Sequence, residues 1–311
     1  MRNWRAGLEI ALLAALAAMP VIATVTAQPF WLDVATRLAI LALAAAGLNI
    51  ILGLGGLVSF GHAAFYAIGA YAVAIPAHHA LYGGADWLAS SNGLFHVALA
   101  VAAGALFALV TGALALRTKG LHFIMITLAF GQMVYFLLNA LEDYGGDDGL
   151  PVDQRSELPL MSLDDPLHLF GLSFALLAVV LAFTWRLKNA PFGLALTASA
   201  RNARRMRAAG LNVFTVRLAA YVLAGAITAL AGALAAEHAA FVSPAMAEWT
   251  RAGELMFMVI LGGAGRVLGP LTGAAAFVVL EELLSSWTVY WHLPFGLLLI
   301  AVALMQARRA A

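Results

Sequence analysis

The chain consists mainly of long apolar runs separated by short polar or glycine-rich stretches. A helix needs about 20 predominantly apolar residues to cross a bilayer, and most of these runs approach or exceed that length. The pattern therefore predicts an all-α, polytopic membrane protein with about ten transmembrane helices. The predicted spans are 7–26, 34–53, 60–80, 95–116, 121–141, 167–185, 217–236, 253–264, 267–284 and 287–306.

The eighth span, 253–264, is short and runs into the sequence LGGAGRVLGP (261–270). Glycine and proline at membrane depth predict one broken or re-entrant helix, because irregular backbone is tolerated there only where protein or a water-filled cavity covers it. The break is expected at Gly262, Gly263, Gly265 and Gly269. The similar stretch ILGLGGLVSFG (51–61) indicates either a duplicated half or two independent tight turns on the cytoplasmic side.

The positive charges are distributed asymmetrically between alternate connections. With a cytoplasmic N-terminus, ten spans place 14 of the 17 basic residues in the cytoplasm and only Arg37, Arg155 and Arg251 outside. Cytoplasmic loops of membrane proteins carry an excess of Lys and Arg, so we expect both termini to be cytoplasmic. The acidic residues show the reverse distribution, since only Glu9 falls inside.

The first span has a second interpretation. A basic start and an apolar run precede the small-residue sequence TVTAQ (24–28), as in a secretory signal peptide. Retention and cleavage both stay open, and we expect a retained helix.

The composition agrees with a membrane protein and excludes several kinds of site. The chain is 63% hydrophobic with a mean hydropathy of +0.92, above the range of soluble domains. A net charge of +1, segregated by loop, gives no basis for nucleic-acid binding. Without cysteine, the chain has no disulfide, thiol nucleophile or cysteine-based metal site, and its eight histidines form no HExxH motif.

The chain also lacks its own source of energy for transport. A phosphate-binding loop requires a lysine after glycine, whereas Lys119 and Lys188 follow Thr118 and Leu187. An ion-coupled transporter usually keeps ionisable residues inside the membrane, but here the charges lie near the predicted span ends: Glu9, Arg37, Glu254, Glu281 and Glu282. We therefore expect no enzyme activity and no cofactor in this chain, which would act as a conduit powered by another protein.

The basic segment TASARNARRMRAAGLN (197–212) stands out from the apolar chain. No Asp or Glu lies between Asp165 and Glu237 to balance its arginines. Thr197 or Ser199 is a plausible N-cap, and glycine is a common stop signal. One explanation is a solvated loop near anionic lipid headgroups. The other is a helix on which a soluble ATPase docks, formed by Arg201, Arg204, Arg205, Arg207 and Gly210.

Four ordered stretches then resemble one family. They are GLVSFGHAAFYAIGAYAVAI (56–75), the segment 120–150, the segment 190–234, and LGGAGRVLGPLTGA (261–274). The sequence resembles the permease family of branched-chain amino-acid ABC importers, and more narrowly its M-type (LivM-like) subunit. It departs from the family pattern at Tyr144, where threonine is usual, and at Asn202 and Ala203, where an acidic residue usually follows the arginine.

The resemblance implies a multi-pass protein of the bacterial inner membrane that forms a single transmembrane permease domain, 1–311. Its partners would be a second permease subunit, two cytoplasmic ATPase subunits that bind ATP and Mg, and a periplasmic solute-binding protein. The basic loop 186–216 would couple the permease to the ATPase. The acidic loop 142–165 would lie on the periplasmic side, where it is either simply solvated or part of the docking surface for the binding protein.

The glycine-rich early span is the candidate translocation pathway, because small residues there let backbones approach polar and aromatic tips. We predict pathway contacts for Ser59, Gly61, His62, Phe65 and Gly69. The alternatives are a helix-end histidine bound to a carbonyl for His62, and ordinary packing for Phe65 and Tyr66.

Three functions stay open. The first is import of branched-chain amino acids, with urea or short amides as alternative solutes of the same architecture. The second is an ATP-independent channel or facilitator. The third is an intramembrane enzyme using Ser59 and His62, which we do not expect because the sequence shows no oxyanion-hole pattern.

Overall fold

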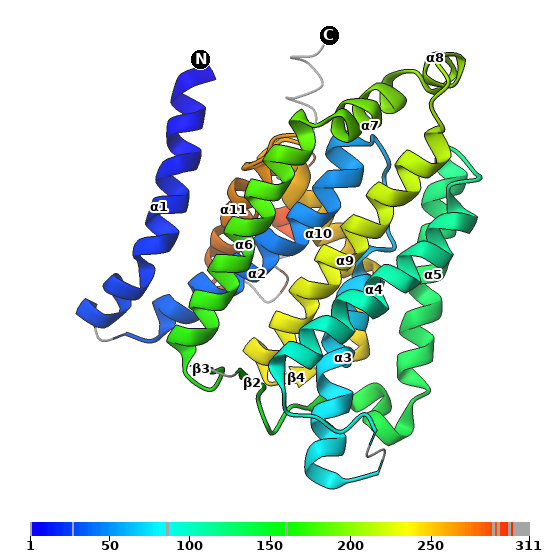
Figure 1. Cartoon of the computed structure of the whole chain (residues 1–311). Helices are drawn as coiled ribbons and strands as arrows, with labels where there is room; N and C mark the ends of the chain where they lie inside the picture. The colour runs from blue at the N-terminus through cyan, green and yellow to red at the C-terminus, as the bar shows by residue number, and fades with distance from the viewer. Residues whose placement is uncertain are drawn as a thin grey trace.

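The computed structural model describes residues 2–26, 28–84, 87–158, 161–287, 290, 293–297 and 300. The chain is an all-α polytopic membrane protein, as predicted. Its long helices are α1 (Arg2–Thr26), α2 (Phe30–Asn49), α3 (His62–Tyr82), α4 (Gly93–Ala115), α5 (Leu121–Asn139), α6 (Pro166–Asn189), α9 (Val213–Ala239), α10 (Trp249–Gly262) and α11 (Gly269–Ser285). Two short helices, α7 (Pro191–Arg201) and α8 (Ala203–Ala208), lie at one end of the bundle (Figure 1).

Each of the first nine predicted spans corresponds to one of these long helices. Within the described residues, five segments are long and apolar enough by themselves to cross a membrane: Phe30–Leu54, Gly93–Ala115, Leu121–Asn139, Pro166–Asn189 and Val213–Ala239. The predicted tenth span, 287–306, falls largely outside the described residues.

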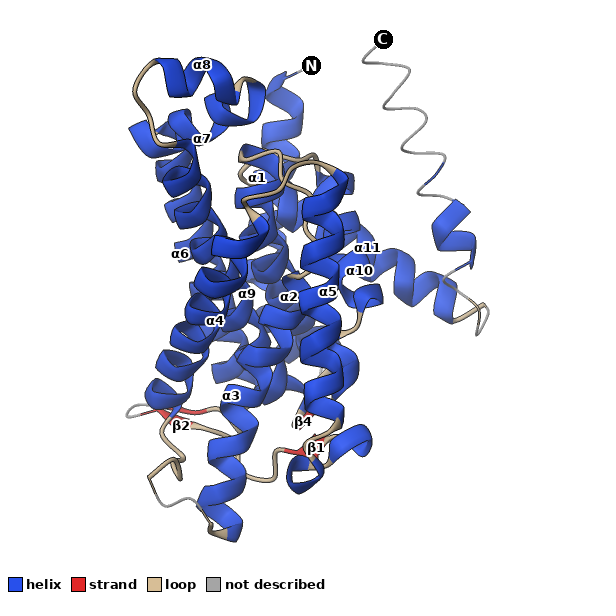
Figure 2. Cartoon of the chain, turned by 90° about the vertical axis from the view of Figure 1, so that its right-hand side faces the viewer, coloured by secondary structure: helices blue, strands red, loops and turns tan. Residues whose placement is uncertain are grey.

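Short irregular elements occupy the end opposite α8 (Figure 2). Strand β1 (Leu150–Pro151) pairs antiparallel with β4 (Phe241–Val242), and β2 (Glu157–Leu158) pairs with β3 (Met161–Ser162). The 3-10 turns η2 (Glu142–Tyr144) and η3 (Gly146–Asp148) precede β1, and η4 (Pro244–Ala247) leads into α10. The acidic loop 142–165 thus lies at the end of the bundle away from the basic segment.

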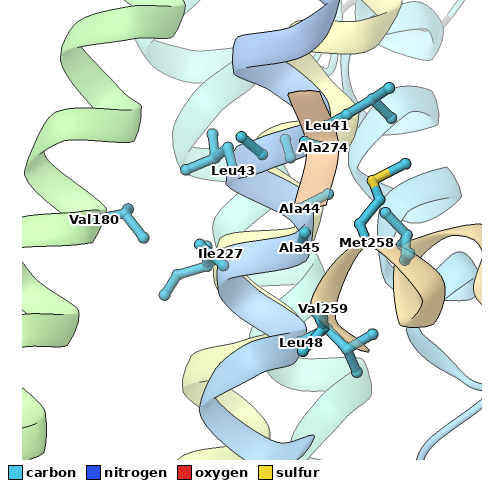
Figure 3. Packing of buried hydrophobic residues seen from close by; sticks show 14 of the residues in the cluster. Leu41, Leu43, Ala44, Ala45, Leu48, Val180, Ile227, Met258, Val259 and Ala274 are labelled. Carbon is cyan, nitrogen blue, oxygen red and sulfur yellow. The ribbon is translucent and has the colours of Figure 1, made fainter. Parts of the chain in front are cut away.

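Helices α2 and α9 form the centre of the bundle. α9 packs against α2, α3 and α4, and Figure 3 shows α2 residues packed among side chains of α6, α9, α10 and α11. Small residues make the approach close: a Cβ added to Gly69 of α3 would lie 1.8 Å from the Ala229 carbonyl oxygen of α9. Helices in lipid associate through such close contacts, because the acyl chains are as apolar as the helices and no hydrophobic effect drives the helices together.

The glycine-rich early span is not a continuous helix. α2 ends in the π-helical turn η1 (Ile50–Leu54), and residues 55–61 are then irregular up to the start of α3. The Phe60 nitrogen donates to Thr127 Oγ1 at 3.2 Å, and Thr127 lies two turns into α5. α3 therefore begins inside the bundle, and irregular backbone occurs here as well as between α10 and α11.

The eighth and ninth spans are separated by the turn 263–268. Gly263 and Gly265 have φ angles of 93° and 79°, a region that favours glycine. Asn49 of α2 clamps the turn, donating from Nδ2 to the Arg266 carbonyl oxygen at 2.8 Å and accepting from the Gly265 nitrogen at 2.9 Å. Lys188 Nζ donates to the Gly265 carbonyl oxygen at 2.7 Å. Side chains of α2 and α6 thus satisfy the irregular backbone.

The two similar glycine-rich stretches, 51–61 and 260–270, meet in space. A Cβ added to Gly53 would lie 2.2 Å from the Gly265 nitrogen. Glycine is therefore needed where the two stretches touch. This holds whether they are a duplicated half or two independent turns.

One prediction about the basic segment is wrong. Thr197 and Ser199 do not cap a helix; both lie inside α7 and donate to the carbonyl oxygens of Gly193 and Leu196. The chain breaks at Asn202, whose side chain accepts from the Arg205 nitrogen at 3.0 Å and caps α8. Asparagine is among the strongest N-caps, so it divides the segment into two helices.

Candidate coupling surface and translocation pathway

The α8 surface is defined as Arg201 at the end of α7 together with Arg204, Arg205 and Arg207 of α8, and all four side chains are exposed. α8 itself contains no buried residue. No salt bridge within the described part of the chain involves any of the four arginines. The helix ends before Gly210, which has a φ angle of 83° as expected for a glycine stop signal. The surface is therefore available to anionic groups from outside this chain.

In contrast, α7 is anchored to the bundle. Leu196 is 0% exposed and Ser199 is 2% exposed. Arg217, near the start of α9, donates from Nη2 to the Ser199 carbonyl oxygen at 2.8 Å and from Nε to Ser199 Oγ at 3.4 Å. A displacement of α7 would thus act directly on α9, which packs against α2, α3 and α4.

A basic groove adjoins the α8 surface. This cavity of about 400 Å³ lies between the connection of α4 to α5 and the start of α9. Three cations and several apolar side chains surround it. Its lining is Leu116, Lys119, Ala203, Arg207, Asn212, Val213, Phe214 and Arg217. The groove extends the cationic surface toward the transmembrane helices.

The predicted pathway residues gather at the start of α3. His62 is 0% exposed, and its Nδ1 lies 3.2 Å from Ser59 Oγ rather than against a carbonyl oxygen. Its Nε2 has no hydrogen-bond partner among the described residues. Phe65 stacks edge-on against His62 and Tyr221, with ring centroids 5.1 and 5.5 Å apart.

The remaining pathway candidates differ in their surroundings. Gly61 is buried beside Thr127, and a Cβ there would lie 3.0 Å from the Thr127 carbonyl oxygen. Gly69 lies against the backbone of α9, where it serves helix packing. Ser59, His62 and Phe65 therefore form one buried cluster in this conformation, whereas Gly69 lies two turns further along α3.

A buried carboxylate at the opposite end of the bundle was not predicted from the sequence. Glu237 of α9 is 3% exposed and accepts from the backbone nitrogen of Ser156 at 3.1 Å and from Ser156 Oγ. His96 Nδ1 lies 2.5 Å from the same hydroxyl, and its Nε2 lies 2.8 Å from the Ser90 carbonyl oxygen. This network fastens the acidic loop to α4 and α9. No local motif indicates it, because its members are far apart in sequence.

The described residues offer no metal centre, since no group of three or more His, Asp or Glu side chains could hold an ion. The geometry instead presents an exposed cationic end, an anchored helix beneath it and a buried polar cluster in the bundle. That arrangement suits transmission of movement better than bond chemistry.

The chain is similar to known permeases. Residues 30–303 match the family described as the permease component of branched-chain amino acid transport systems. The high-affinity branched-chain amino acid transport system permease protein LivM of Escherichia coli (strain K12) is 31% identical over 303 residues, covering 88% of this chain and 68% of LivM. The autoinducer 2 import system permease protein LsrC of Yersinia pseudotuberculosis serotype O:1b (strain IP 31758) is 27% identical over 231 residues, covering 67% of this chain and 62% of LsrC.

One solved structure, described as an inward-facing conformation of a metal-chelate type ABC transporter, covers 96% of this chain and 99% of its own. The identity is 14% and the TM-score is 0.46, a likeness too weak to support an argument.

Proposed function

Since the chain belongs to the family of permease components of branched-chain amino acid transport systems, we propose that it is the M-type permease subunit of an ATP-driven importer in the bacterial inner membrane. Its solutes are branched-chain amino acids. ATP and Mg are bound by partner subunits, and this chain performs no chemistry of its own.

The α8 surface carries this proposal. Exposed cations attract carboxylates, and arginine in particular binds them in a planar, bidentate geometry. No acidic residue lies between Asp165 and Glu237, so the complementary charges come from another chain. A cytoplasmic ATPase with an acidic groove would receive α8, and Arg217 would pass its movement from α7 to α9.

The two remaining partners would bind at the transmembrane part of the chain and at the end that carries the acidic loop. A second permease subunit completes the transmembrane part. A periplasmic solute-binding protein docks on the end that carries the acidic loop 142–165, at which β1 and β4 pair. The cluster of Ser59, Gly61, His62 and Phe65 borders the route that opens when the bundle rearranges.

The proposal is tested by expressing this chain together with the ATPase, second permease and solute-binding protein of the same importer. We expect a stable complex that hydrolyses ATP in response to solute-loaded binding protein and that takes up leucine, isoleucine and valine. Uptake of urea or acetamide alone would change the solute class. Uptake that persists with a Walker-lysine mutant of the ATPase would favour an ATP-independent facilitator.

A further inference from the structure

Four charged side chains gather between α2, α10 and α11, although the sequence places them near span ends. Arg37 Nη2 lies 2.6 Å from Glu281 Oε1, and Arg251 Nη1 lies 2.7 Å from Glu254 Oε2. Arg251 also lies within electrostatic range of Glu281. We call Arg37, Arg251, Glu254 and Glu281 the charge cluster.

One member of the charge cluster lies within a segment that is long and apolar enough to cross a membrane. Arg37 is the eighth residue of α2, inside the apolar segment Phe30–Leu54. Glu281 lies four residues before the end of α11. Tyr66 is 5% exposed, and its carbonyl oxygen would be 1.8 Å from a Cβ added to Gly232 of α9. Ionised groups at such positions are costly to keep, so they usually have a function.

The charge cluster is neither sealed nor fully satisfied. The side chains of Arg37 and Arg251 are 36% and 34% exposed. Glu281 Oε2 is buried and has no hydrogen-bond partner within the described residues. A buried carboxylate oxygen without a donor destabilises the structure, because its hydrogen bonds to water are lost and no hydrogen bond within the protein replaces them. The site thus has one buried carboxylate oxygen without a donor beside two partly exposed arginine side chains.

We infer that the charge cluster binds the charged end of a zwitterionic amino acid during its passage, an inference that rests on the proposed function. An ammonium group would donate to Glu281 Oε2, and a carboxylate would bind a guanidinium in place of its present partner. The cluster's charges sum to zero, so a zwitterion enters without changing the net charge of the site. The alternative is that the two ion pairs only tie α2 to α11 and stabilise α10.

The first test replaces Glu281 with Gln in the complete importer. Leucine uptake is measured at several concentrations and normalised to the amount of assembled complex. We expect Glu281→Gln to lower uptake by about tenfold or more at subsaturating leucine, because the ammonium acceptor loses its charge. Glu282→Gln is the matched control, since this neighbour is exposed and outside the cluster; it should change uptake less than twofold. Equal uptake in both variants would overturn the inference.

The second test exchanges the charges of Arg37 and Glu281. It distinguishes a role in binding the amino acid from a purely structural role of this ion pair. Arg37→Glu combined with Glu281→Arg preserves an ion pair between α2 and α11 but reverses its direction. We expect the double variant to assemble with its ATPase and to remain at least tenfold slower in leucine uptake. Recovery of wild-type uptake would show that the pair only ties the helices. If Glu281→Gln does not assemble, Glu281→Asp tests the same position, with an expected loss of about fivefold.

The outcomes distinguish this inference from the proposed function. A wild-type complex that moves no leucine refutes the proposed function, and this inference with it. A wild-type complex that moves leucine, with a Glu281→Gln variant that moves it equally well, refutes only the assignment of the charge cluster.

Discussion

Arg217 of α9 donates a hydrogen bond from Nη2 to the carbonyl oxygen of Ser199 in α7, over a distance of 2.8 Å. This contact joins the short helix α7 to α9, which packs against α2, α3 and α4. Hydrogen bonds to charged groups contribute about 1.5–3 kcal/mol. We expect this contact to carry a movement of α7 to α9, which a mutation of Arg217 can test.

The first prediction concerns this contact. Arg217→Leu removes both hydrogen bonds to Ser199, so α7 should move without transmitting its motion to α9. We expect the ATPase to copurify normally and leucine-stimulated ATP hydrolysis to fall by about tenfold, as expected for about 1.4 kcal/mol. Arg117→Leu, an exposed residue on the same side, is the control. Unchanged stimulation in Arg217→Leu would show that another contact carries the coupling.

The second prediction concerns helix packing. A Cβ at Gly69 would overlap the backbone of Ala229, and backbone atoms cannot move aside cheaply. Gly69→Ala should lower the thermal stability of the purified subunit, with a cost of about 1–3 kcal/mol typical of overpacking. Gly171→Ala in α6, where nothing lies within 4 Å, should be neutral or slightly stabilising. Equal melting temperatures for the two variants would contradict the close approach of α3 and α9.

The third prediction concerns the turn between α10 and α11. Gly263 has a φ angle of 93°, which a β-branched residue adopts only with strain. Gly263→Val should therefore reduce both the membrane level of the protein and leucine uptake. Wild-type expression and uptake in this variant would mean that the turn does not require glycine.

The fourth prediction concerns topology. A reporter fused after Leu150 should be periplasmic, and a reporter fused after Arg207 should be cytoplasmic, because the basic residues are segregated by side. Alkaline phosphatase and green fluorescent protein fusions give complementary readouts. The ten-span topology fails if both fusion sites lie on the same side of the membrane.

Much of the architecture could be predicted from the sequence because apolar length is a local property. Nine spans, the stop at Gly210 and the irregular turn at Gly263 and Gly265 each depend on neighbouring residues. The break at Asn202 was missed although its cause is also local. The Asn202 side chain competes with the helix for backbone hydrogen bonds. The alanines and arginines on both sides favour helix, so the local composition gave no sign of the break.

The long-range contacts could not be predicted in this way. Arg37 and Glu281 are 244 residues apart, and each one alone looks like an ordinary charge near a helix end. The clamp of Asn49 on the turn at Gly265 likewise joins distant parts of the chain. Such pairs appear only when the packing of α2 against α10 and α11 is known. The irregular residues 55–61, in contrast, lie largely in the glycine-rich connection predicted between the spans 34–53 and 60–80.

The central claim is that the α8 surface couples this permease to a cytoplasmic ATPase. The most direct measurement is copurification and solute-stimulated ATP hydrolysis of the complex with Arg204→Glu and Arg205→Glu combined. Both side chains are exposed, so the protein should insert normally. Repulsion from acidic partner groups should weaken ATPase binding and abolish stimulation.

The control is Arg5→Glu combined with Arg117→Glu, which makes the same change in charge on the same predicted side of the membrane, at two residues outside the loop 186–216. We expect this control to retain both ATPase binding and stimulated hydrolysis, while the α8 variant loses both. An α8 variant that binds the ATPase and transports leucine like the wild type would contradict the account.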